Sequence, residues 1–162
     1  MRPLVVIGAT EGFGRAQPLL ARDDRIVVLE DKFSRARETR EQPIDVLARP
    51  DGTAAALHFA AHSPERINSL VLENPPAAEE FATLLPQLAM PVLVLYGTRE
   101  GAASERGRSY KALLPNGWFV MVYGAGSDIA NDRPEAYADL IGDFLKRGAR
   151  FTISEQSSRI NP

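Results

Sequence analysis

IDVLARPDGTAAAL, residues 44 to 57, is the stretch that decides the fold. Its short apolar run stops at Pro50-Asp51-Gly52 and passes directly into an alanine-rich segment that we expect to be helical. A strand, a sharp turn and a helix in immediate succession form the layout of a nucleophile elbow, in which small residues let strand and helix approach closely. The apex of this turn is Pro50, which has neither a nucleophilic atom nor a backbone N–H. The pattern therefore predicts the scaffold of an elbow without its nucleophile.

Length and composition fit a globular domain. The chain has 162 residues, of which 44% are hydrophobic and 25% are charged, and these proportions are ordinary for a soluble protein. The net charge of −2 is spread over both signs without a basic block, so we expect neither nucleic acid nor a membrane as a partner. The absence of cysteine excludes disulfides, thiolate nucleophiles and zinc–cysteine sites. We expect a cytoplasmic protein, because no apolar run approaches the ~20 residues of a membrane span. The predominance of arginine over lysine, together with abundant alanine, indicates a bacterial source.

Apolar runs and helical segments alternate along the chain. We expect strands over residues 4–7, 25–29, 44–47, 67–72, 92–96 and 118–123, with a polar helix or surface loop over 32–42. Alternation of this kind is typical of βαβ units. The predicted fold class is therefore α/β, a three-layer sandwich with a mainly parallel sheet of about six strands between two layers of helices.

The helices are predicted from spacing and from end signals. Residues 52–62 and 79–88 are expected to be helical, the latter because its leucines and Phe81 fall on one face. Ser104 is expected to cap the next helix, and the last begins near Pro134 and ends before Gly148. We expect residues 1–148 to form a single domain, and the polar tail, 149–162, to dock on a partner subunit of a homo-oligomer.

Five stretches in sequence order resemble the α/β-hydrolase family: the elbow, HSPERINSLVLENPP (62–76), MPVLVLYGTRE (90–100), LLPNGWFVMVYGAGS (113–127) and RPEAYADLIGDFLKR (133–147). The resemblance implies a strand order of 2-1-3-4-5-6 and a first turn, residues 8–14, whose backbone N–H helps to form an oxyanion hole. It also implies a reduced form of the family, without its first two strands, without the usual helix between residues 29 and 44, and without a lid domain between residues 72 and 92.

The resemblance allows the catalytic positions to be compared one by one. Pro50 stands where the family has its nucleophilic serine, Glu100 keeps the acid, and Ser127 stands where the family has its histidine. Acyl transfer needs both the nucleophile and its base, so we expect no serine hydrolysis. The predicted catalytic residues are then Glu100, Asp51 and Ser127, acting by a non-hydrolytic acid–base route such as that of a lyase, isomerase or cyclase.

Further polar residues are expected at the carboxyl ends of the strands, where open α/β sheets bind ligands. As substrate-binding residues we predict Gly8, Thr10, Glu11, Arg49 and Asp128. The structural alternative is that the charged residues only form ion pairs, Arg49 with Glu100 or Arg99 with Asp51. We expect a small molecule to bind here, without a cofactor; the functional alternative is a non-catalytic interaction or scaffold subunit.

Two other patterns indicate different chemistry. The spacing of Gly8, Gly12 and Gly14 after a strand resembles the glycine turn of short-chain dehydrogenases, and Glu30 or Asp31 is placed to hold a ribose. This resemblance implies a nucleotide-binding domain as a further alternative, although no Tyr-x-x-x-Lys pair accompanies it. His58 and His62 are four residues apart on one predicted helix, but no third metal ligand is evident from the sequence. We expect packing, in the core or on the surface, to be their role, and no metal.

Overall fold

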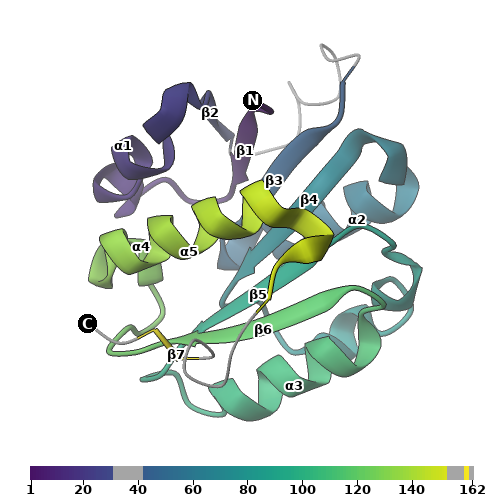
Figure 1. Cartoon of the computed structure of the whole chain (residues 1–162). Helices are drawn as coiled ribbons and strands as arrows, with labels where there is room; N and C mark the ends of the chain where they lie inside the picture. The colour runs from purple at the N-terminus through teal and green to yellow at the C-terminus, as the bar shows by residue number, and fades with distance from the viewer. Residues whose placement is uncertain (31–41, 153–158, 161–162) are drawn as a thin grey trace.

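The computed structural model describes residues 1–30, 42–152 and 159–160. The predicted helix or loop over 32–42 therefore lies almost entirely outside the described residues. One sheet organises the described part of the chain, and its strands run in the order β2-β1-β3-β4-β5-β6-β7 (Figure 1).

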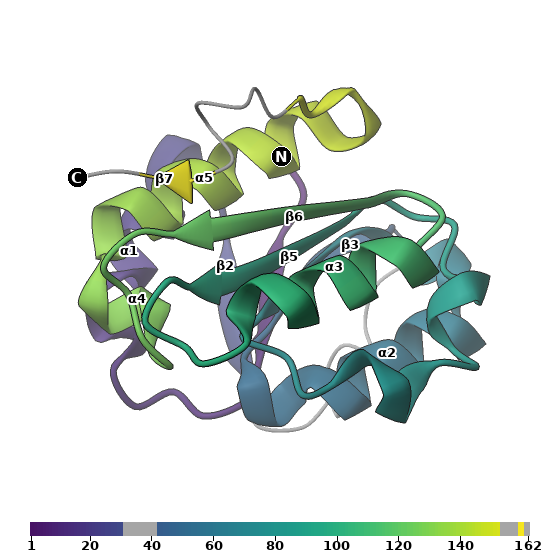
Figure 2. The same cartoon turned by 90° about the horizontal axis from the view of Figure 1, so that it is seen from below.

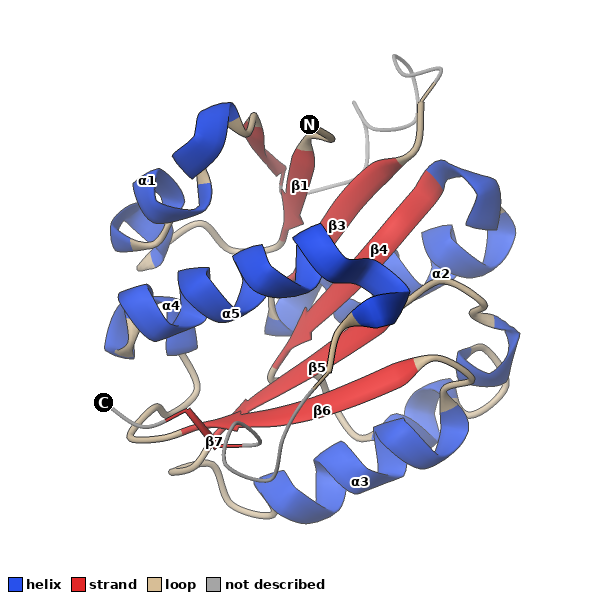
Figure 3. Cartoon of the chain, in the orientation of Figure 1, coloured by secondary structure: helices blue, strands red, loops and turns tan. Residues whose placement is uncertain are grey.

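Every neighbouring pair of strands in this sheet is parallel. The prediction of a parallel sheet in the order 2-1-3-4-5-6 is confirmed, and β7 adds a two-residue strand beside β6 (Figure 3). The strands are β1 (Leu4–Ile7), β2 (Val27–Glu30), β3 (Ile44–Ala48), β4 (Ile67–Glu73), β5 (Val92–Gly97), β6 (Gly117–Val122) and β7 (Arg159–Ile160).

Helices cover both faces of the sheet, which gives three layers (Figure 2). The helices α1, α4 and α5 lie on one face, and α2 and α3 lie on the other. Their bounds are α1 (Gln17–Leu20), α2 (Thr53–His62), α3 (Ala103–Leu113), α4 (Ile129–Asp132) and α5 (Pro134–Arg147). Short 3-10 turns complete the connections: η1 (Phe13–Arg15), η2 (Arg22–Asp24), η3 (Pro50–Gly52), η4 (Pro64–Arg66), η5 (Ala78–Phe81), η6 (Leu85–Gln87) and η7 (Gly148–Arg150).

The strands are apolar on both sides because both of their faces are covered. In β4, Leu70 and Leu72 pack into the core beneath α2 and α3, whereas Val71 packs beneath α5. The helix that we expect to begin near Pro134 and to end before Gly148 is α5. Successive residues of a strand point to opposite faces of the sheet, and together with the amphipathic pattern of α5 this produces two apolar cores with the sheet between them.

Two predictions of local structure are wrong. Residues 79–88 form the 3-10 turns η5 and η6 instead of a helix, because Pro86 cannot continue a helix that starts near residue 79. Ser104 does not cap α3, which begins at Ala103 after Ala102 in a left-handed conformation. His58 and His62 both lie exposed on α2, so of the two expected locations, the core or the surface, the structure places them on the surface.

The connection between β4 and β5 consists of turns and contains no inserted domain. Its start is fixed by two buried hydroxyls, since Tyr96 donates to the Pro75 carbonyl at 2.6 Å and Tyr110 donates to the Pro76 carbonyl at 2.6 Å. Among the described residues, no helix has the length and apolar character needed to cross a membrane.

Candidate functional site

The elbow is built as its sequence predicts. β3 ends at Ala48, Arg49 is extended, η3 contains Pro50 and the chain then enters α2. A Cβ atom at Gly52 would lie 2.3 Å from the carbonyl oxygen of Ile7 in β1. Only glycine therefore allows the turn to approach the neighbouring strand this closely. The close approach expected of an elbow is present, with a proline at its apex.

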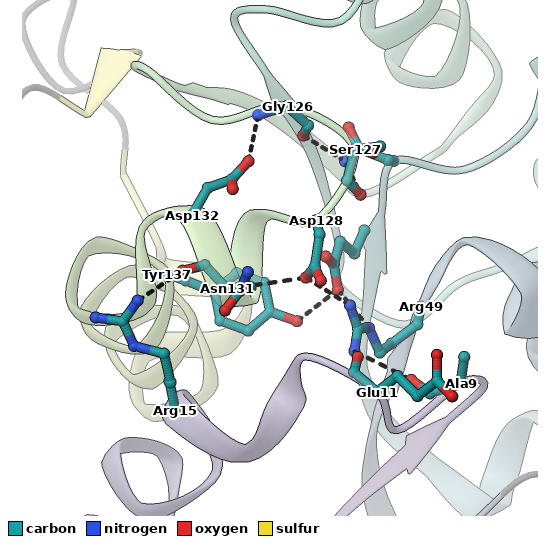
Figure 4. A network of polar contacts seen from close by, with 12 residues as sticks. Ala9, Glu11, Arg15, Arg49, Gly126, Ser127, Asp128, Asn131, Asp132 and Tyr137 are labelled. Carbon is teal, nitrogen blue, oxygen red and sulfur yellow. Dashed lines mark hydrogen bonds and ion pairs between the residues drawn. The ribbon is translucent and has the colours of Figure 1, made fainter.

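Arg49 is the centre of the polar network at this end of the sheet (Figure 4). Its side chain is 5% exposed. Nη1 donates to the carbonyl oxygens of Ala9 at 3.0 Å and Glu11 at 2.9 Å, and Nη2 donates to Oδ1 of Asp128 at 2.7 Å. The guanidinium also lies 5.4 Å from the centre of the Phe13 ring. It thereby joins the first turn, the elbow and the loop after β6.

Glu73, the last residue of β4, is the second partner of Arg49. Its Oε2 lies 3.3 Å from Nε of Arg49, and its side chain is fully buried. Tyr137 of α5 donates its hydroxyl to the same Oε2 at 2.8 Å. Burial raises the pKa of Glu73, while the Arg49 guanidinium opposes that rise. Burial, together with the Glu73 charge, also raises the pKa of the Tyr137 hydroxyl well above its usual value, so this tyrosine stays a proton donor.

Asp51 lies in η3, at the turn of the elbow, and contacts the turn after β1. Both of its carboxylate oxygens accept from the backbone N–H of Ala9, each at 3.0 Å. This is the turn in which the family resemblance implies an oxyanion-hole amide. Gly8 makes the contact possible, since its φ of +118° is left-handed and a Cβ there would lie 2.5 Å from Oδ1 of Asp51. The amide of Ala9 therefore already has an anionic partner within the chain.

Asn74 holds three strand ends together. Its side-chain oxygen accepts from Gly97 N–H at 3.2 Å, and its Nδ2 donates to the carbonyl oxygens of Gly126 at 3.1 Å and Ser127 at 2.9 Å. Its own φ of +40° is one that asparagine tolerates better than most residues. Asp128 completes the same loop as the N-cap of α4, accepting from Asn131 N–H at 3.2 Å. The loop after β6 is thus fixed from both sides.

The remaining predicted site residues lie around this network at the same end of the sheet. Thr10, Glu11 and Ser127 are exposed, and Glu100 is partly exposed. Ser127 contributes its main-chain carbonyl to the loop contacts. Whether these residues bind or transform a ligand stays a prediction.

The structural alternative predicted ion pairs with the wrong partners. Arg49 pairs with Glu73 and Asp128. Arg99 pairs at 3.2 Å with Asp132, which also accepts from Gly126 N–H at 2.8 Å. Glu73, Asn74 and Tyr137 were missed because their sequence signals are those of a strand end, a turn and a core aromatic residue.

The glycine turn is filled by carboxylates of the chain itself. Ala9 N–H donates to Asp51, and a Cβ at Gly12 would lie 2.3 Å from Oδ2 of Asp128. A pyrophosphate placed here would meet these negative charges, which disfavours the nucleotide-binding alternative. Of the two predicted ribose ligands, Glu30 is buried and Asp31 lies outside the described residues.

Two hollows open on the described surface away from the network. One, of about 290 Å³, lies between α1 and α5, beside residues that precede β2 in the sequence. It is therefore near the amino end of β2, whereas the network lies at the carboxyl ends of the strands. The other, of about 220 Å³, lies between η5 and α3. Neither is lined by Asp51 or Glu100. Among the described residues, no three His, Asp or Glu side chains gather in a group that could hold a metal ion.

Comparison with known proteins identifies the fold. No family model and no curated protein matches the sequence, but several solved structures are similar. An α/β-hydrolase enzyme from the metagenome of sediments of the Mar Chica lagoon in Morocco has a TM-score of 0.76 and 16% identity, covering 90% of this chain and 91% of that chain. A serine hydrolase involved in carbazole degradation has a TM-score of 0.75 and 14% identity, with coverages of 90% and 91%.

A third similar structure is a predicted CIB-like hydrolase from Thermoplasma acidophilum, with a TM-score of 0.71 and 12% identity, covering 90% of this chain and 86% of that chain. At these identities the likeness concerns the fold. Together with the strand order and the elbow geometry, it shows that the chain has the α/β-hydrolase fold, here in a small domain with a parallel sheet.

Proposed function

We propose that this protein is a non-hydrolysing member of the α/β-hydrolase fold that acts by binding and not by turnover. The observation that carries the proposal is the engagement of Arg49. Its guanidinium is buried at the strand ends and is held by two main-chain carbonyls and two carboxylates. Because these contacts lie within the chain, the guanidinium has few N–H donors left to contact a substrate. Transition-state stabilisation needs donors aimed at the reacting group.

Asp51 supports the same proposal. A serine hydrolase stabilises its tetrahedral intermediate with free backbone N–H groups. Here the N–H of Ala9 donates to the Asp51 carboxylate, which would have to leave before an external oxyanion could enter. Together with Pro50 at the nucleophile position and Ser127 at the base position, this removes the nucleophile, the base and one oxyanion-hole donor.

A fluorophosphonate probe tests the absence of hydrolysis, because it labels only serines that a base has activated. We expect no labelling of the wild-type protein or of Pro50→Ser, and no turnover of a nitrophenyl acetate ester above buffer. Pro50→Ser combined with Ser127→His supplies a nucleophile and a base, and adding Asp51→Gly also frees the Ala9 amide. We expect the fluorophosphonate to label the triple variant faster than the double variant. Ester turnover by the wild-type protein that is lost in Glu100→Gln would overturn the proposal.

The binding role is tested through self-association, since a homo-oligomer is the partner expected from the sequence. Sedimentation velocity over a wide concentration range should give a sedimentation coefficient that rises with protein concentration. A monomer at all concentrations would leave the homo-oligomer prediction wrong and direct the search to a different protein partner.

A second candidate function is acid–base chemistry on a small molecule. It is favoured by two exposed residues with carboxylate side chains, Glu11 in the turn after β1 and Asp51 in the elbow. A thermal-shift screen with nucleotides, acyl compounds and small organic acids tests it, because a ligand that binds only the folded state raises the melting temperature. A ligand whose effect disappears in Asp51→Asn would support this candidate over the binding of a protein partner.

A further inference from the structure

We propose that His58 and His62 form a surface site for one divalent transition-metal ion that prefers imidazole nitrogen, such as Zn²⁺ or Ni²⁺. The chain contains two histidines and no cysteine. Both histidines lie on α2, four residues apart, and both side chains are exposed. Residues i and i+4 are neighbours on one helix face. Both imidazole side chains of the protein therefore lie one turn apart on the same face of α2.

The orientation of the His62 ring favours a role as a metal ligand. Its Nδ1 lies 2.7 Å from the carbonyl oxygen of His58. A carbonyl oxygen can only accept, so Nδ1 carries the proton and the neutral ring presents the lone pair of Nε2. Histidines that bind metals usually donate their other ring N–H to a carbonyl or carboxylate, which fixes the tautomer and the ring. His62 has this outer contact in place.

His58 can supply the second nitrogen. The two ring centres are 6.3 Å apart and the ring planes are inclined by 40°. An exposed side chain changes rotamer within nanoseconds, so the His58 ring can turn one nitrogen toward an ion held by His62. Ala54, one turn before His58 on the same face, is also exposed and adds only a methyl group. Because both histidines are also exposed, water molecules can reach an ion held between them and complete its coordination shell.

The place of the pair on α2 favours a cation. His62 is the last residue of α2, and Ser63 is its C-cap. The carbonyl ends of a helix carry partial negative charge, which attracts positive charge within the last turn. A divalent ion bound by His58 and His62 would lie in this last turn. The helix C-terminus and the two imidazoles thus act in the same direction.

This site is independent of the strand-end network and of the proposed function. Two protein ligands with water in the remaining positions are fewer than the four of a structural zinc site, so we expect exchangeable binding and not a requirement for folding. The ion would reversibly stabilise α2, because a ligand that binds the folded state raises the melting temperature. Binding should weaken as the solution is acidified, since a protonated imidazole cannot ligate a metal.

Calorimetric titration with NiCl₂ tests the site in the wild-type protein, His58→Gln, His62→Gln and Ala54→Gln, the last being a matched change at an exposed position of α2. We expect one ion per wild-type chain, an affinity at least about tenfold lower in each histidine variant, and unchanged binding by Ala54→Gln. An electron paramagnetic resonance spectrum with Cu²⁺ should show two coupled imidazole nitrogens. Absence of saturable Ni²⁺ binding, or loss of affinity in only one of the two histidine variants, would overturn the proposal.

Discussion

Replacing Arg49 with methionine is the sharpest test of the network at the strand ends. The change keeps most of the side-chain volume but removes the cation that faces the fully buried Glu73. Breaking a buried ion pair by removing one partner leaves an uncompensated charge and costs about 3–5 kcal/mol. For a chain of this length, a loss of that size lowers Tm by roughly 10 °C. Urea unfolding followed by the fluorescence of Trp118, the single tryptophan, measures the loss.

The pH dependence identifies Glu73 as the cause. Burial already raises the pKa of Glu73 above its ordinary 4.5, and Arg49 opposes the rise. Without Arg49, the pKa in the folded protein is higher still. Between the unfolded and the folded pKa the folded state then binds more protons. The stability of Arg49→Met is therefore greatest below about pH 4.5 with respect to this group, and falls as the pH rises through the folded pKa.

Two further variants decide whether the reasoning holds. Adding Glu73→Gln to Arg49→Met removes the buried charge, and the double variant should regain much of the lost stability near neutral pH. Arg99→Met breaks an exposed pair, in which the Arg99 side chain is 64% exposed, and should cost no more than about 1 kcal/mol. The reasoning is refuted if Arg49→Met costs as little as Arg99→Met, or if the gain from Glu73→Gln is the same at every pH.

Three single substitutions test local packing and hydrogen bonding. Tyr137→Phe removes the hydroxyl that donates to Glu73 at 2.8 Å; loss of a buried hydrogen bond to a charged group should cost about 1.5–3 kcal/mol in urea unfolding. Gly142→Ala should raise Tm by a few degrees, because Gly142 lies within α5 with no neighbour near a new Cβ and alanine gains up to about 1 kcal/mol in a helix. Gly52→Ala should instead lower Tm, because its Cβ would meet the Ile7 carbonyl oxygen at 2.3 Å; a gain there would contradict the close packing of the elbow.

Much of the fold could be predicted because its signals are local. β1 and α5 have the bounds expected from an apolar run and an amphipathic repeat, and parallel pairing follows from their alternation. The connection between β4 and β5 could not be predicted in the same way. Its apolar residues have helical spacing, but Pro86 interrupts the segment, and Phe81 and Leu85 reach the core from 3-10 turns. Hydrophobic spacing indicates which residues are buried more reliably than which backbone conformation carries them.

Sequence reasoning could predict only part of the polar site. Arg49 and Asp128 were expected at the strand ends, because the position of a residue after a strand is a local property. Which residues they contact depends on the tertiary structure. Glu73 reads as the polar end of an apolar strand and Tyr137 reads as a core aromatic, yet they meet at 2.8 Å across 64 residues of sequence. A buried carboxylate facing a buried guanidinium is recognised only once the two elements are packed together.

The network also leads us to expect that restoring the triad residues would not by itself rebuild an enzyme. In a parallel sheet the loops after the strands converge at the carboxyl ends, and a catalytic site there must leave donors free for a substrate. In this chain Arg49 draws the first turn and the loop after β6 inward, while Asp51 satisfies the Ala9 amide. A substrate that used these groups would have to replace several of these contacts at once. The proline at the elbow is thus one of several features in which these strand ends differ from the catalytic site that the family resemblance implies.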